Sequence, residues 1–108
     1  MNWKEIQQKC PKAYNECAKW VDETLMPINE KSTIPPDLNQ INIRDLYDFF
    51  DENGIYVVVL YNGIAPHGCH PGFWSEINNR PYNKTNIKRI DTEQDAFTKA
   101  FEILENEF

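Results

Sequence analysis

The residue types with the richest chemistry gather in one short segment, residues 65–72. It holds both histidines of the chain and one of its three cysteines, which are His67, Cys69 and His70. Imidazole and thiolate are the usual protein ligands of transition metals, and a structural zinc site needs four of them in a tetrahedron. Because three ligands this close in sequence can seldom all reach one ion, two of the three are realistic. We therefore interpret the segment as a polar hairpin loop rich in glycine and proline, with a zinc site as the alternative.

The same segment suits a thiol nucleophile, because a thiolate beside an imidazolium is the pair that thiol enzymes use. Adjacent residues rarely point at each other, however, and no Asn or Asp is obviously placed to orient a histidine base. The other two cysteines, Cys10 and Cys17, are interpreted as small buried hydrophobes. The chain has only four glycines and neither glycine-rich phosphate-binding pattern. We therefore assign no catalytic residue.

Aromatic residues form a second set of candidates. They make up 13% of the chain, which is more than a core of this size usually needs. Trp and Tyr are over-represented at the energetically dominant positions of protein interfaces. Alternation along strands would place some of them on an open sheet face, and plain core packing is the rival interpretation. The predicted residues for binding a protein partner or a second copy are Tyr56, Tyr61, Phe73, Trp74 and Tyr82.

The charge distribution argues against general nucleic-acid binding. The chain carries a net charge of −6 at pH 7, with acids concentrated in residues 45–52 and 93–107. Binding to phosphates needs clustered cations. Residues 77–90 reverse the sign, and we interpret them as belonging to an ordinary surface of mixed charge. The acids of 45–52 fit the solvated face of a helix, although an inhibitor that imitates nucleic acid would also use such carboxylates.

Length and composition predict one cytoplasmic domain, residues 1–108. No apolar run is long enough to span a membrane, and the first residues lack the basic-then-apolar layout of a secretory signal. The cysteines are odd in number and form no disulfide framework. We expect a reduced protein with no membrane partner and no cofactor apart from the zinc considered above.

The beginning of the chain is predicted to be helical. Apolar residues recur at the three-to-four spacing of an amphipathic helix over residues 2–25. Proline removes a helical hydrogen bond but is tolerated at the first position of a helix. Pro11 therefore divides the pattern into a short helix over 2–9 and a longer one from Pro11 to Leu25. Turn-forming residues make 26–40 a linker.

A helix and a hairpin are predicted next. A short amphipathic helix covers residues 43–53 and ends at Gly54, which supplies the left-handed cap. Every residue of Ile55–Tyr61 is β-branched, aromatic or apolar. This indicates a central strand covered on both faces, or a strand with one face covered by a partner. Gly72–Ile77 alternates in polarity and is the predicted returning strand.

The remaining residues predict a turn over 78–82, a third strand over 86–90 and a final helix. Thr92 and Asp95 resemble a capping box at the start of that helix. One apolar stripe predicts the side of the helix that packs on the core, and its members are Ala96, Phe97, Ala100, Phe101, Leu104 and Phe108.

Together these elements predict an α+β fold in the order α-α-α-β-β-(β)-α. Helices from the N-terminal and C-terminal regions pack on a short antiparallel sheet of two or three strands. The helical segment (residues 2–25), the linker (residues 26–40) and the helix-sheet-helix segment (residues 43–108) belong to one domain.

Three segments resemble a family of small proteins. They are Arg44-Asp-Leu-Tyr-Asp-Phe-Phe-Asp-Glu-Asn-Gly-Ile55, Asp91-Thr-Glu-Gln-Asp-Ala-Phe-Thr-Lys-Ala-Phe-Glu-Ile-Leu-Glu105, and the opening Asn2–Ile6 followed by Cys10–Ala13. The family consists of small uncharacterised proteins from Bacteroides-type gut bacteria, their prophages and their phages. The resemblance covers about half of the chain and carries no activity, cofactor or catalytic residue. It implies a cytosolic accessory protein of a mobile element.

The function that these observations favour is a non-enzymatic interaction or accessory protein of a mobile element or its bacterial host. It would bind another protein through aromatic sheet residues and the loop over 63–72. The alternative is a small metal-dependent or thiol-dependent enzyme, or a zinc-binding protein, that uses His67, Cys69 and His70.

Overall fold

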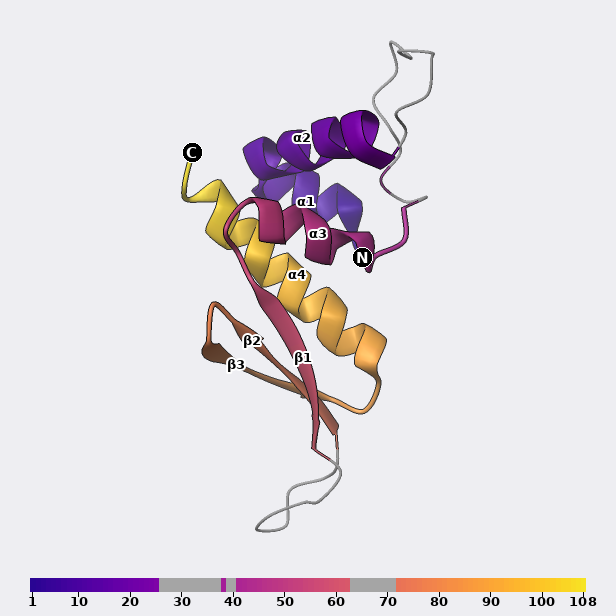
Figure 1. The fold of residues 1–108 in the computed structure, drawn as a ribbon, viewed down its shortest axis with the longest axis vertical. Coiled ribbons are helices and arrows are strands. Elements are labelled where there is room, and N and C mark those ends of the chain that lie inside the picture. Colours follow the sequence, from indigo (N-terminus) through magenta and orange to yellow (C-terminus); the bar gives the residue numbers. More distant parts are fainter. Residues whose placement is uncertain (26–37, 39–40, 63–71) are drawn as a thin grey trace.

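Helices and an antiparallel sheet make up the described chain, which confirms the α+β class (Figure 1). The computed structural model describes residues 1–25, 38, 41–62 and 72–108. Among the described helices none is both long and apolar enough to cross a bilayer. In chain order the elements are α1 (Trp3–Lys9), α2 (Pro11–Trp20), a π-helical turn (Val21–Leu25), α3 (Asp45–Glu52), β1 (Val57–Asn62), β2 (Gly72–Ile77), β3 (Arg80–Asn86) and α4 (Arg89–Glu105).

The break between the first two helices falls at Pro11, as predicted. Asn2 caps α1 by accepting the N–H of Glu5 at 3.1 Å. Pro11 is the first residue of α2, where its missing N–H costs nothing. The N–H of Ala13, two residues later, donates a hydrogen bond to the side chain of Glu105 in α4 at 2.9 Å. This bond ties the start of α2 to the end of α4.

The third helix and the first hairpin follow the prediction closely. The helix α3 ends at Glu52 with Asn53 as its C-cap, and Gly54 adopts the left-handed conformation with φ of +75°. The strands β1 and β2 pair antiparallel, with Val57 opposite Ile77 and Asn62 opposite Gly72. β2 has the bounds that the sequence predicts.

The third strand is where the prediction is wrong. The turn after β2 has only two residues, because Asn78 and Asn79 adopt φ of 52° and 66°, the combination of a tight type I′ turn. The strand β3 therefore begins at Arg80 and not at residue 86. Pro81, which favoured a longer turn, lies within β3, and prolines are tolerated in edge strands.

The sheet order β1-β2-β3 places β2 in the centre. The prediction that Ile55–Tyr61 forms a central strand is therefore wrong, since β1 lies at an edge. Only one face of this apolar run is buried, because Val57 points toward the core whereas Val58 is 46% exposed. The other predicted alternative is that a partner covers one face of this strand, and it is taken up with the candidate site below.

The final helix begins at Arg89 with Lys88 as its N-cap, four residues before the predicted cap at Thr92. Thr92 is already inside it and is buried, so the predicted capping box is wrong. Its hydroxyl donates to the carbonyl of Phe73 and accepts from the amide of Asn86, each at 3.2 Å, and so fastens α4 to the sheet. The apolar stripe is confirmed from Ala96 to Leu104, whereas Phe108 is 55% exposed.

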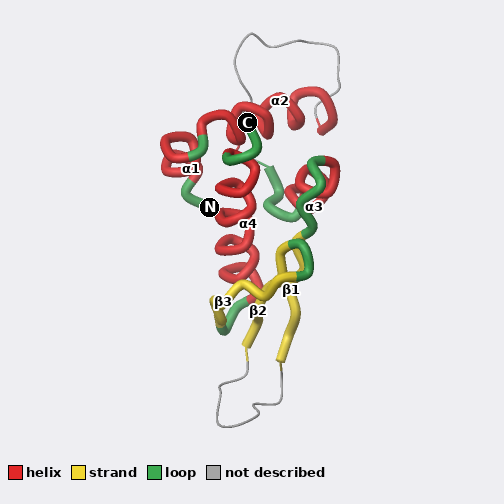
Figure 2. Tube along the Cα trace, turned by 90° about the vertical axis from the view of Figure 1, so that its left-hand side faces the viewer, coloured by secondary structure: helices red, strands yellow, loops and turns green. Residues whose placement is uncertain are grey.

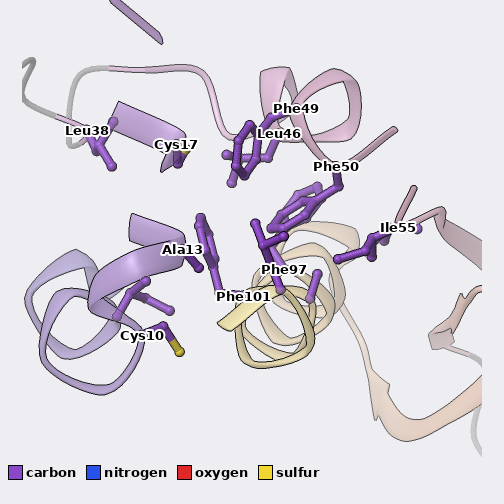
Figure 3. Packing of buried hydrophobic residues seen from close by; sticks show 14 of the residues in the cluster. Cys10, Ala13, Cys17, Leu38, Leu46, Phe49, Phe50, Ile55, Phe97 and Phe101 are labelled. Atoms are coloured by element: carbon purple, nitrogen blue, oxygen red, sulfur yellow. The ribbon is translucent and has the colours of Figure 1, made fainter. Parts of the chain in front are cut away.

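The core lies where α3 and α4 face each other. Figure 3 shows Phe49 and Phe50 of α3 beside Phe97 and Phe101 of α4, and all four are fully buried. The rings of Phe50 and Phe101 meet edge-to-face with centroids 4.9 Å apart. The helix α4 is long enough to contact both the α1–α2 pair and all three strands, so it joins the helical and sheet regions of the fold (Figure 2).

Candidate functional site

The predicted zinc ligands and thiol nucleophile, His67, Cys69 and His70, lie outside the described residues. The zinc and thiol hypotheses for that loop therefore stay predictions. Within the described region of the chain, no group of three or more His, Cys, Asp and Glu side chains is placed to hold a metal ion.

The other two cysteines are buried as predicted. Cys10 is 3% exposed and Cys17 is fully buried, and both are free thiols. Burial raises the pKa of Cys17 from 9.0 to about 12. Burial also raises the pKa of Cys10, and the carboxylates of Glu105 and Glu102 add to that effect. Both thiols are therefore held in the protonated, unreactive form.

Native Cys17 is expected to react with iodoacetamide at pH 8 about 1000-fold more slowly than in the unfolded chain. Only the thiolate reacts, and raising the thiol pKa from 9.0 to about 12 lowers the thiolate fraction by that factor. Mass spectrometry of timed reactions, with and without guanidinium, measures both rates. Equal rates in the two conditions would contradict the buried position of Cys17.

The five predicted aromatic binding residues divide between the two faces of the sheet. Residues opposite each other on neighbouring strands point to the same face. The buried pair Val57 and Ile77 identifies the face that meets the helices. By alternation along the strands and by pairing, this helix-side face also receives Tyr61, Phe73 and Tyr82. The outer face receives Tyr56 and Trp74, so the structure brings only some of the predicted set together.

The outer face is largely apolar, with Glu76 opposite Val58 as its charged member, and no described helix lies over it. Tyr56 is 57% exposed and Val58 is 46% exposed. Leu60 and Trp74 lie opposite each other on the same face and are half-buried. Figure 1 shows α4 running along the other side of the sheet, with the remaining helices beyond the sheet's upper end. We call Tyr56, Val58, Leu60 and Trp74 the outer-face patch.

The backbone of β1 presents a second feature at the edge of the sheet. The N–H of Asn78 donates to the carbonyl of Tyr56 at 2.8 Å. This bond shows which residues of β1 turn their backbone groups toward β2 and which turn them away. From Tyr56 onward, every second residue turns its backbone groups toward β2. The residues between turn their N–H and C=O groups to the open edge, and these are Val57, Val59 and Tyr61.

A cavity of about 340 Å³ lies beside this edge, between α3, β1 and the start of α4. It is lined by Arg44, Tyr47, Val59, Arg89 and Glu93. The volume is at the lower end of the range of small-molecule pockets, and the lining is predominantly polar. Arg44 immediately precedes α3, while Arg89 and Glu93 lie on one side of the first turns of α4.

A buried carboxylate organises the cavity. Glu93 is 1% exposed, and its Oε2 accepts the hydroxyl of Tyr47 at 2.8 Å. The Nε of Arg44 lies 3.5 Å from the same oxygen. Burial and the hydrogen bond to Glu93 raise the pKa of Tyr47, so its hydroxyl stays a proton donor. The other oxygen, Oε1, is buried with no hydrogen-bond partner among the described residues.

The second cation of the cavity has no such carboxylate. The guanidinium of Arg89 lies over the ring of Phe73, 5.3 Å from its centroid. Phe73 in turn contacts Tyr61, with ring centroids 4.9 Å apart. Among the residues that the structure describes, Arg89 forms no ion pair. The cavity therefore holds two cations. Glu93 partly neutralises Arg44, whereas Arg89 can pair with an incoming anion.

Sequence reasoning does not find this cavity. Its residues come from three separated segments, and only the packing of α3 and α4 against β1 brings them together. One usable signal exists, since Arg89 ends the basic stretch of residues 77–90. That stretch is interpreted above as an ordinary surface.

Comparison with known proteins adds no relative. The chain matches no protein-family model, no curated protein and no solved structure. The resemblance to the Bacteroides-type family stays a prediction.

Proposed function

We propose that this chain is a non-enzymatic protein-interaction domain, serving as an accessory protein of a mobile element or its bacterial host. The observation that carries the proposal is the outer-face patch, in which four apolar side chains share a sheet face with Glu76 and none of the described helices covers them. Solvated faces of antiparallel sheets are ordinarily polar. An apolar face therefore indicates a surface that a partner covers.

The residue types support the same conclusion. Tyr and Trp combine large apolar area with a polar group and are enriched at interface hot spots. Tyr56 and Trp74 are among the residues that sequence analysis assigns to binding. The occupant that suits this patch is a protein with a complementary apolar surface. Because apolar contacts are little screened by salt, its binding should be insensitive to ionic strength, unlike that of an acidic nucleic-acid mimic.

The Val58→Asp variant is expected to weaken partner binding by at least about tenfold, because an unpaired charge would be buried at the interface. The matched control is Ile87→Asp, which adds the same charge at a side chain that is 84% exposed and outside the strands. Partners are captured from host lysate with the wild type and both variants, and self-association is followed by light scattering.

Loss of one stoichiometric partner, or of self-association, with Val58→Asp alone supports the proposal. Equal capture by all three proteins contradicts it. Circular dichroism verifies the fold, and Tyr56→Asp provides a second variant, since Tyr56 precedes β1 and its side chain is exposed.

A further inference from the structure

We propose that the open edge of β1 accepts an extended segment of a partner protein as a fourth strand, with one acidic side chain of that segment held by Arg89 and Arg44 in the cavity. This inference rests on the proposed protein-binding function and specifies a second contact surface and the chemistry of the partner segment.

A row of backbone groups lies along the open edge of β1. Val57, Val59 and Tyr61 turn their N–H and C=O groups away from β2, and no hydrogen bond joins these groups to another described residue. Such a row is a template for one more strand, whose main chain would satisfy all of them. The backbone thus selects an extended segment over a helix.

The two edges of the sheet differ. The opposite edge, β3, contains Pro81 and has an irregular register with β2. Both features discourage pairing with another chain. The six residues of β1 contain neither a proline nor a charged side chain. Among the described residues, the β3 edge therefore carries features that discourage pairing and the β1 edge carries none, which is the arrangement expected of a strand-binding edge.

The cavity lies directly beside the open edge of β1. Val59 lines the cavity and also turns its backbone groups outward. A residue paired with Val59 on an added strand would point to the same face, which is the side of the cavity. Arg89 has no described ion-pair partner, so a carboxylate at this position completes the charge balance of the site.

The flanking positions define the rest of the recognition pattern. Residues two places before and after the acid would face Val57 and Tyr61 on the same side of the sheet. Tyr61 is 61% exposed beside Phe73, so an apolar or aromatic side chain there gains contact area. A second copy of β1 does not fit, because its sequence Val-Val-Val-Leu-Tyr-Asn contains no acid for Arg89. The partner segment is therefore foreign, with an acid between apolar residues at alternate positions.

The test begins with selection of random twelve-residue peptides, displayed on phage, against the full chain. Enriched peptides are expected to carry an acid flanked by apolar residues at alternate positions. Their affinity is then measured by fluorescence anisotropy for the wild type, Arg89→Gln and Lys88→Gln. The last is the matched control, because Lys88 is an exposed neighbouring cation that does not line the cavity.

Arg89→Gln is expected to weaken binding by at least about tenfold, and Lys88→Gln to leave it within about twofold. Replacing the peptide's acid with glutamine should remove the difference between the wild type and Arg89→Gln. Hydrogen exchange of the wild type should show that the peptide newly protects the amides of Val57, Val59 and Tyr61.

Equal affinity for the wild type and Arg89→Gln overturns the proposal, as does the absence of enriched peptides or of new protection along β1. Succinate serves as a further probe. If it displaces the peptide and binds in an Arg89-dependent way without protecting β1, the site takes a small carboxylate and strand addition is wrong. None of these outcomes alters the Val58→Asp result, so failure here and failure of the proposed function remain distinguishable.

Discussion

Replacement of Phe101 by alanine is expected to lower the free energy of unfolding by about 3–5 kcal/mol, the cost of deleting a buried aromatic ring. Phe101 is fully buried and contacts the rings of Trp3 and Phe50 with centroid distances of 5.6 and 4.9 Å. Small domains have a total stability of about 5–15 kcal/mol, so this loss is a large fraction of it. Urea denaturation followed by tryptophan fluorescence measures the change.

The control for this variant is Phe108→Ala on the same C-terminal segment. Phe108 is 55% exposed, so its removal should change stability by no more than about 0.5 kcal/mol. Similar losses for the two variants would contradict the packing of α4 on α1 and α3.

Tyr47→Phe is the second large expected effect, with a loss of about 1.5–3 kcal/mol of unfolding free energy. The substitution removes only the hydroxyl that donates to Glu93 at 2.8 Å. Glu93 is 1% exposed, and its Oε1 already lacks a described partner, so its carboxylate would keep only the half-exposed Arg44. Hydrogen bonds to charged groups contribute about this amount, and the loss leaves a buried acceptor unsatisfied. Thermal and urea denaturation measure it.

The matched control is Tyr56→Phe, in which the ring is 57% exposed and water replaces the lost contact. That variant should stay within about 0.5 kcal/mol of the wild type. Adding Glu93→Gln to Tyr47→Phe should recover some of the loss, because a neutral amide costs less to bury than a carboxylate. A double variant less stable than Tyr47→Phe alone would show that Glu93 depends on contacts other than Tyr47.

The helices and the first hairpin are predictable because local patterns determine them. The proline at residue 11, the glycine at residue 54 and the apolar stripe from Ala96 to Leu104 each act within a few residues of chain. The third strand is predicted too late in the chain because two asparagines in the left-handed conformation shorten the turn. The early start of α4 is missed because Thr92 bonds to the sheet, a contact that depends on tertiary structure.

One part of the candidate site follows from local sequence patterns, and the other part depends on tertiary packing. Alternation along the strands predicts that Tyr56 and Trp74 can share an open face, and the register places them there. The cavity depends on Arg44, Val59 and Glu93 meeting from separate segments, which no spacing along the chain encodes. Whether β1 is central or at an edge is likewise decided by where β3 pairs, and the composition of β1 does not contain that information.

The long helix α4 also determines when the protein can fold in the cell. It contacts the α1–α2 pair and all three strands, and it is translated after every one of them. Until α4 leaves the ribosome, Phe49 can contact Trp20 of α2, but Phe50 and the apolar side of the sheet lack the helix that buries them. The elements made earlier therefore reach their final packing only when α4 docks, so completion of the fold follows synthesis of α4.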